Sequence, residues 1–259
     1  MLWTDTLKAL IQHRLARRGY TFVNIERMEA LMADKMEDVI RLFSKSEEFL
    51  FPPNDMRARL IALLQGTSVL EGLFLLKYLY ISMNVEGDIC EFGVAQGATS
   101  ALLANELRST NRHIWLFDSF AGLPEPTEED ELADRRDWTG KMCNPRNQVE
   151  KRLHKIGFPR SRTHIVAGFF PKSAKNNAPN CICFAYVDFD LYNSIRDALH
   201  FIDKRMPIGG RIVVDDYSPP QFPGARKAVD EFVSHHNFDI WIPDCEKFAV
   251  LSKQSGERD

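Results

Sequence analysis

The chain has 259 residues, of which 44% are hydrophobic, so it can bury the core of one large domain or of one domain with a substantial extension. Its net charge of −3 excludes a general electrostatic attraction to nucleic acid or to an anionic membrane, and we expect neither as a partner. The five cysteines are odd in number and contain no CxxC pair, which argues against a disulfide framework and against a structural zinc site.

The N-terminal sequence, "MLWTDTLKALIQHRLARRGY", has the features of neither a signal peptide nor a membrane span. Its apolar stretch contains charged residues and is not followed by a small-residue cleavage site. No apolar run elsewhere in the sequence is long enough to cross a bilayer. Together with the cysteine pattern, these features predict a cytoplasmic protein that is not secreted.

Residues 1–85 are predicted to be helical, because their apolar residues recur at helical spacing. One apolar stripe, expected to pack in the core, consists of Met28, Leu31, Met32, Met36, Val39, Ile40 and Phe43. The segment "SVLEGLFLLKYLYISM" is apolar on so much of its circumference that its helix should lie between two layers. We therefore predict a helical N-terminal extension or lid packed on the core, and its apolar helices favour a homo-oligomer.

From residue 88 the sequence alternates between apolar strands and helices. The expected strands are "DICEFGV", "HIWLFDS", "THIVAGFF", "ICFAYVDFD", "GRIVVDDYS", "FDIWI" and "KFAVLSK". Near-continuous apolar strands alternating with helices predict a mostly parallel sheet covered on both faces, in an α/β domain over residues 86–259. A short turn separates the last two strands, which should form an antiparallel hairpin at one edge.

Residues 121–150 form a connection that is longer than most in a compact domain. The segment contains prolines and many charges, and two interpretations stay open: a solvated insertion, or a lid beside a ligand. The lid is considered because the segment follows the second strand, at the end of such a sheet where ligands bind.

The ends of the first two strands predict a nucleoside site. In "CEFGVAQGATS", Glu91 and Gly93 are followed by Gly97 and a helix, so the backbone can turn sharply and offer free N–H groups to a ligand. Asp118 ends the second strand, where doubly wound folds bind a ribose, although an aspartate there also serves as a turn or N-cap residue in many proteins. The pattern lacks the dehydrogenase signature GxGxxG, so we favour S-adenosylmethionine, whose charged end would pair with Glu91.

Four aspartates follow the next pair of strands. Asp188 and Asp190, two residues apart on an extended segment, leave the same face, and the next strand ends in Asp215 and Asp216. Four carboxylates at one end of neighbouring strands would repel one another unless a cation or protons compensated them. Because all the candidate ligands are oxygens, Mg²⁺ is favoured over Zn²⁺, with Mn²⁺ as a substitute. The alternative is that these aspartates only cap the following helices.

These segments resemble the macrocin O-methyltransferase (TylF-type) family of class I, S-adenosylmethionine-dependent methyltransferases. The resemblance covers roughly residues 70–250 and is carried by "EFGVAQGATS", "LFDSFAGLPEP", "VDFDLYNSIRDAL" and "GGRIVVDDYSPPQFPGARKAVDEF", in the order of the family. It implies a Rossmann-like sheet of seven strands with an antiparallel last strand. The N-terminal 70 residues and parts of residues 121–150 match no pattern that can be carried over.

The resemblance also implies roles for individual residues. Asp188, Asp215 and Asp216 would hold Mg²⁺, and Asp190 would be the general base that takes a proton from an acceptor hydroxyl. The acceptor would be a sugar or another small molecule, and a vicinal diol is favoured because it could chelate the ion. The residues assigned to the cofactor are Glu91, Phe92, Gly93, Gly97, Thr99, Ser100, Asp118, Ser119, Gly168, Phe169 and Asp188.

Two other functions stay open. An apolar strand that ends in DxD also occurs in metal-dependent glycosyltransferases that use nucleotide sugars, and this function would leave Glu91 and Gly93 without a role. The second alternative is a Rossmann-like interaction module without catalytic activity, which the full set of carboxylates disfavours.

Overall fold

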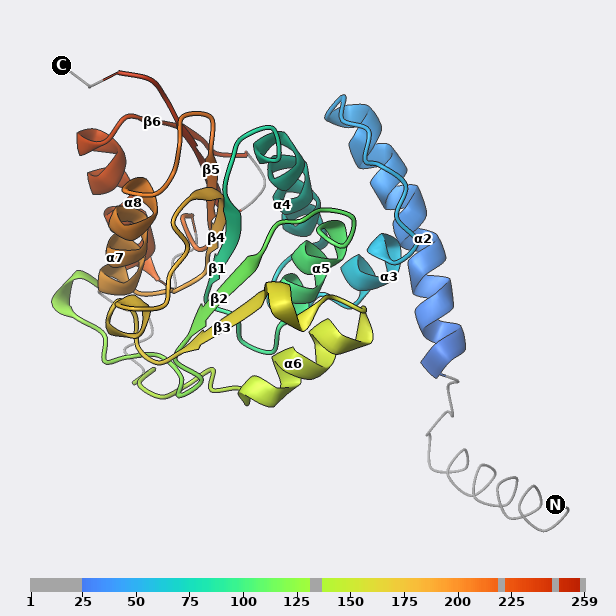
Figure 1. The fold of residues 1–259 in the computed structure, drawn as a ribbon, viewed down its shortest axis with the longest axis horizontal. Helices are drawn as coiled ribbons and strands as arrows, with labels where there is room; N and C mark the ends of the chain where they lie inside the picture. The colour runs from blue at the N-terminus through green and yellow to red at the C-terminus, as the bar shows by residue number, and fades with distance from the viewer. Residues whose placement is uncertain (1–24, 131–136, 219–221, 244–246, 257–259) are drawn as a thin grey trace, which may run out of the picture.

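The computed structural model describes residues 25–130, 137–218, 222–243 and 247–256, and its centre is a seven-stranded sheet in the order β3-β2-β1-β4-β5-β7-β6 (Figure 1). The strands are β1 (Asp88–Phe92), β2 (Ile114–Asp118), β3 (Thr163–Ala167), β4 (Ile182–Val187), β5 (Arg211–Val214), β6 (Phe238–Trp241) and β7 (Ala249–Lys253). Neighbours from β3 to β5 are parallel, whereas β7 is antiparallel to both β5 and β6. The predicted mostly parallel sheet with a reversed last strand is confirmed.

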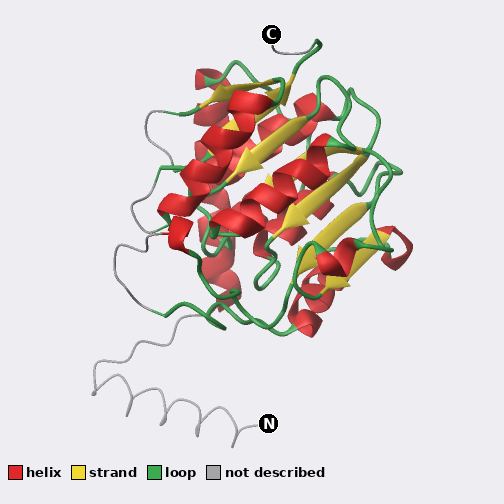
Figure 2. Ribbon diagram, turned by 90° about the vertical axis from the view of Figure 1, so that its left-hand side faces the viewer, coloured by secondary structure: helices red, strands yellow, loops and turns green. Residues whose placement is uncertain are grey.

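Helices cover both faces of this sheet. They are α2 (Ile25–Ser46), α3 (Arg57–Ala62), α4 (Val69–Ser82), α5 (Ala98–Glu106), α6 (Arg146–Lys155), α7 (Tyr192–Asp203) and α8 (Pro223–His235). α4, α5 and α6 share one apolar cluster with one face of the sheet, and α7 and α8 share a second cluster with the other face, which is turned toward the viewer in Figure 2. All the parallel strands therefore end at the same edge of a sheet that is buried on both sides.

α4 lies between the sheet and α2, as its apolar sequence predicts. The ring of Phe74 contacts the rings of Phe43 in α2 and of Phe248, which directly precedes β7, with centroids 4.9 and 5.6 Å away. The helix begins after Ser68, whose hydroxyl accepts a hydrogen bond from the backbone N–H of Glu71. Glu71 is fully buried on the side of α4 that packs against β4 and β5.

α2 corrects one expectation. Ile40 and Phe43 are buried, but Met28, Leu31 and Met32 are 43%, 58% and 41% exposed, so the prediction that the whole stripe packs in the core is wrong for its N-terminal half. The reason is geometric: α2 has 22 residues and runs along the edge of the molecule, where the six-residue α3 is its main contact (Figure 1). Helical spacing shows which face is apolar but not what covers it.

The described parts of residues 121–150 pack beside the carboxyl end of the sheet. Leu123 pairs with Thr139 in an isolated bridge, and the buried carboxylate of Asp130 accepts a hydrogen bond from the N–H of Tyr192, at 2.7 Å, at the start of α7. The last residues of the segment belong to α6, which begins at Arg146. These contacts show that the described part is folded onto the core, while its closure over a ligand stays a prediction.

The division into an extension over residues 1–85 and a domain over residues 86–259 also stays a prediction, since residues 1–24 lie outside the described part of the chain. α4 is packed directly on β4 and β5 although it precedes the proposed boundary. None of the described helices combines the length and the apolar character needed to span a membrane.

Candidate active site

A pocket of about 600 Å³ lies at the carboxyl ends of the parallel strands. Eight of the predicted site residues line it: Gly93, Asp118, Ser119, Phe169, Asp188, Asp190, Asp215 and Asp216. It is also lined by residues that the sequence did not single out, including Gln65, Met142, Asn144, Lys172, Phe222 and Lys247. The nucleoside residues and the acidic residues, predicted from separate motifs, therefore belong to one cavity.

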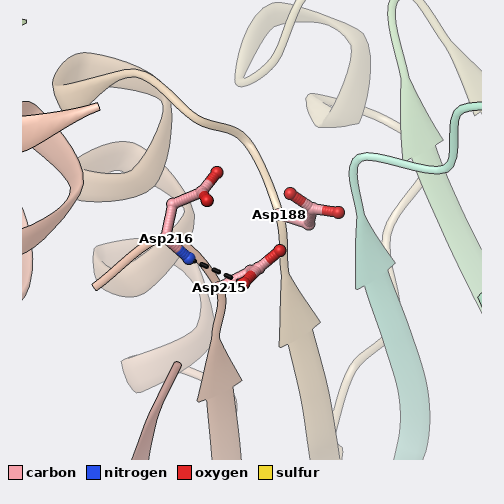
Figure 3. A group of neighbouring side chains, drawn as sticks. All are labelled: Asp188, Asp215 and Asp216. Carbon is pink, nitrogen blue, oxygen red and sulfur yellow. Dashed lines mark hydrogen bonds between the residues drawn. The ribbon is translucent and has the colours of Figure 1, made fainter. Parts of the chain in front are cut away.

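Three of the four predicted carboxylates meet at one point of this pocket. Oxygen atoms of Asp188, Asp215 and Asp216 all lie within 4.8 Å of one another, and Figure 3 shows their carboxylates turned toward a common space. The sheet causes this convergence, because Val187 and Val214 are register partners in parallel strands and the aspartates follow directly. A hydrogen bond of 2.8 Å from the N–H of Asp215 to the carbonyl of Val187 continues the pairing past the strand ends.

The acidic cluster is electrostatically unfavourable without a cation. Burial first, and then the charges of neighbouring carboxylates, raise the pKa of Asp188, Asp190 and Asp215 above the ordinary value for an aspartate. Three carboxylate oxygens at this spacing suit a hard divalent ion such as Mg²⁺ or Mn²⁺, whose charge would remove the repulsion. The residues present therefore fit the predicted metal.

Lys247 is a member of this cluster that the sequence analysis missed. Its Nζ donates hydrogen bonds to Oδ2 of Asp215 at 2.8 Å and to Oδ1 of Asp216 at 3.2 Å. Burial lowers the pKa of Lys247, but the two carboxylates outweigh this and raise it overall. The residue precedes β7, so the antiparallel pairing of β7 with β5 brings it to the carboxyl end of β5. The predicted reversal of the last strand was the signal that could have found it.

Asp190, the predicted general base, lines the pocket but is not one of the three converging groups. It is 8% exposed, and its φ of 57° is in the left-handed region. Burial, the charge of Asp216 and a side-chain hydrogen bond with Asp216 raise its pKa. Asp190 is therefore at the edge of the metal cluster, in contact with one predicted ligand and open to the cavity.

Two further buried groups lie behind Asp188. The hydroxyl of Tyr186 lies 3.0 Å from Oε1 of Glu71 and 3.4 Å from Oδ2 of Asp188. Burial raises the pKa of Glu71 to about 8, and its Oε2 has no hydrogen-bond partner among the described residues. Tyr186 thus connects α4 to the acidic cluster, a link between residues 115 positions apart that no local motif indicates.

Glu91 is not among the residues that line the pocket and belongs to a buried cluster of its own. It is fully buried, and its two carboxylate oxygens accept hydrogen bonds from the hydroxyls of Thr99 and Ser100 at the start of α5. Burial raises the pKa of Glu91 to about 8. None of these three residues is among the described residues that line the pocket, so their direct contact with a cofactor stays a prediction.

Gly93 and Asp118 shape the floor of the pocket. Gly93 has a φ of 88°, and a Cβ added there would lie 1.8 Å from the carbonyl oxygen of Asp188, so only glycine fits between the two motifs. Oδ2 of Asp118 accepts hydrogen bonds from the N–H groups of Val94 and Ala95, at 2.8 and 3.0 Å. Asp118 therefore acts as a turn residue, as the alternative interpretation had it, while it also lines the pocket.

Of the remaining residues predicted to bind the cofactor, some lie in the core and others beside the pocket. Phe92 is fully buried against Phe117, with stacked rings 4.8 Å apart, and belongs to the core. Gly97 has a φ of 79° and precedes the first residue of α5. Gly168 follows β3 with a φ of 122° and donates its N–H to the carbonyl of Asp118, which places the next residue, Phe169, on the pocket wall.

Known proteins are similar to this chain in sequence and in fold. A relative from Streptomyces olivaceus, 8-demethyl-8-(2,3-dimethoxy-alpha-L-rhamnosyl)-tetracenomycin-C 4'-O-methyltransferase, is 28% identical over 175 residues, which are 65% of this chain and 66% of the relative. Demethyldecarbamoylnovobiocin O-methyltransferase from Streptomyces niveus is 28% identical over 167 residues, 62% of each chain. The chain thus matches less than two thirds of the length of either relative.

The structure of the O-methyltransferase NovP has a TM-score of 0.65 at 20% identity, over 88% of this chain and 100% of NovP. This likeness shows that the fold is that of the class I O-methyltransferases. Residues 73–254, which contain every strand of the described part of the chain and the whole acidic cluster, match the family model described as Macrocin-O-methyltransferase (TylF). The chain therefore belongs to the macrocin O-methyltransferase (TylF) family.

Proposed function

We propose that this protein is a Mg²⁺-dependent O-methyltransferase that transfers the methyl group of S-adenosylmethionine to a hydroxyl of a sugar or of another small-molecule acceptor, with Mn²⁺ as an alternative ion. One observation carries the proposal. Asp188, Asp215 and Asp216 converge on the same cavity as Asp190 and the glycine turn after β1. Family membership supplies the reaction class.

The donor half of the proposed site is the turn after β1 and the end of β2. Gly93 keeps this turn in contact with the backbone of Asp188, and Asp118 holds it through the N–H groups of Val94 and Ala95. A bound nucleoside would lie between this turn and Phe169, a residue of the pocket wall that is 48% exposed. We propose that Asp118 binds the ribose, because it lines the pocket even though it also accepts hydrogen bonds from the backbone of the turn.

The acceptor half is the acidic cluster. A divalent ion held by Asp188, Asp215 and Asp216 would lower the pKa of an acceptor hydroxyl and fix its oxygen near the methyl group. Asp190 then takes the hydroxyl proton, a role that suits a carboxylate whose pKa is raised and which opens onto the cavity. Tyr186, whose hydroxyl contacts both Glu71 and Asp188, would help to orient Asp188 from behind.

The class of acceptor rests on the relatives and on metal chemistry. The Streptomyces olivaceus relative is named for 4'-O-methylation of a compound that carries a rhamnosyl group. Three carboxylate ligands would leave other coordination positions of a divalent ion to water and substrate, so a sugar with two neighbouring oxygen donors, such as a vicinal diol, fits the proposed site. The glycosyltransferase and the non-catalytic module are disfavoured by the family to which the chain belongs.

Calorimetry separates the donor assignment from its main rival. We expect S-adenosylmethionine and S-adenosylhomocysteine to bind the metal-free protein with one site per chain, because Asp118 holds the turn after β1 through backbone hydrogen bonds that need no cation. A UDP-sugar should give no heat of binding under the same conditions. Binding of the UDP-sugar together with no binding of S-adenosylmethionine would end the methyltransferase assignment in favour of a glycosyltransferase.

A further inference from the structure

Lys247 contacts two of the three predicted metal ligands. Its Nζ contacts Oδ2 of Asp215 and Oδ1 of Asp216, so the ammonium lies between these two carboxylates. A divalent ion held by both aspartates would also lie between them, because it must reach an oxygen of each. The ammonium and the ion therefore compete for the same two carboxylates.

The backbone of Lys247 is fixed, whereas its side chain can move. The carbonyl of Lys247 accepts a hydrogen bond of 2.9 Å from the N–H of Ser218, and the next residue, Phe248, is fully buried. The side chain is 34% exposed and borders the pocket. The ammonium on its four-carbon stem can thus swing from the carboxylates into the cavity without a change in the fold.

The charge balance of the cluster gives this contact its importance. Asp188, Asp190, Asp215 and Asp216 gather in a site that is mostly buried, and Lys247 is the described cation that forms ion pairs with this group. The single positive charge of the ammonium offsets part of the negative charge of the four aspartates. A divalent ion would offset more of it. A second lysine on the pocket, Lys172, forms no ion pair with these aspartates in the described part of the chain.

We propose that Lys247 is an internal counter-ion of the metal site, which pairs with Asp215 and Asp216 when no metal is bound and withdraws into the pocket when a divalent ion binds. This proposal rests on the proposed function, since it requires that the three aspartates hold such an ion. Its consequence is that Lys247 weakens metal binding while it stabilises the metal-free protein. Loss of the ammonium should therefore strengthen the binding of the ion, an effect opposite to that of structural damage.

The test is a titration of the full-length, metal-free protein with Mn²⁺. Binding is measured from the electron paramagnetic resonance signal of the Mn²⁺ that stays free. We expect Lys247→Met to bind Mn²⁺ more tightly than the wild type by on the order of tenfold, the scale of one neighbouring charge. Lys172→Met, which removes a lysine of the same pocket, should bind like the wild type. Lys247→Gln replaces the methionine variant if that variant does not fold, because the glutamine amide can still donate a hydrogen bond to a carboxylate. It should also bind Mn²⁺ more tightly than the wild type.

Each outcome has one meaning. Tighter binding by the Lys247 variants and unchanged binding by Lys172→Met support the counter-ion. Binding by the wild type with an equal or weaker affinity in both Lys247 variants overturns the counter-ion and leaves the metal site standing. If neither the wild type nor any variant binds Mn²⁺, both the counter-ion proposal and the metal part of the proposed function are overturned.

Discussion

Replacement of Asp190 with asparagine is expected to lower kcat by on the order of 10² or more, the scale of a lost general base. The substitution keeps the shape of the side chain and removes its ability to accept a proton. Asparagine is also suited to the backbone there, because the φ of 57° is in the left-handed region, which asparagine adopts more readily than most residues. A loss of activity in this variant therefore cannot be attributed to backbone strain.

The measurement is kcat with saturating donor, acceptor and Mg²⁺, together with the affinity for S-adenosylmethionine. We expect this affinity to stay close to that of the wild type, because Asp190 lies at the acidic end of the pocket. The matched control is Asp197→Asn, since Asp197 lies on α7 outside the lining of the pocket and pairs with Arg196. Wild-type turnover by Asp190→Asn would remove Asp190 from the mechanism.

Asp215→Asn is expected to weaken Mn²⁺ binding by more than the 10- to 100-fold that is typical for the loss of an outer partner of a metal site. The residue provides one of the three converging carboxylates, and Asp188 and Asp216 alone leave a two-ligand site. Turnover should fall with the affinity, and excess Mg²⁺ should restore part of it. Titration of the metal-free protein with Mn²⁺ measures the effect.

The stability of this variant distinguishes a lost ligand from a damaged fold. Burial and Asp216 raise the pKa of Asp215 despite its contact with Lys247, so the ionised form is less favourable in the folded protein than in the unfolded chain. At neutral pH this difference destabilises the fold, and a neutral asparagine removes it. We therefore expect the melting temperature in chelator to stay unchanged or to rise. Unchanged Mn²⁺ affinity would contradict the assignment of Asp215 to the metal.

The convergence of the acidic residues could be predicted from the sequence because it depends on strand order alone. The apolar segments that precede Asp188 and Asp215 are typical of buried parallel strands, and the carboxyl ends of such strands meet at one edge. The same reasoning predicted that Gly93 and Asp118 lie at this edge. These four positions needed no knowledge of side-chain packing.

The residues that the sequence did not reveal depend on packing between distant segments. Lys247 reaches the cluster through the antiparallel insertion of β7 beside β5, and Glu71 reaches it through the packing of α4 on β4. For Glu91 the sequence placed the residue correctly near the end of β1, but it did not show that Thr99 and Ser100 would bind its carboxylate or that Glu91 would be missing from the pocket lining. Periodicity likewise marked the apolar face of α2 without showing that its N-terminal half is exposed.

The most direct test of the proposed function is the metal dependence of methyl transfer from isotopically labelled S-adenosylmethionine to a panel of sugars and glycosylated small molecules. The full-length protein is assayed after treatment with a chelator, and again after Mg²⁺ is restored in excess. We predict that the chelator abolishes transfer to the accepted hydroxyl compound and that Mg²⁺ restores it. Undiminished transfer in the presence of chelator would contradict the role assigned to Asp188, Asp215 and Asp216.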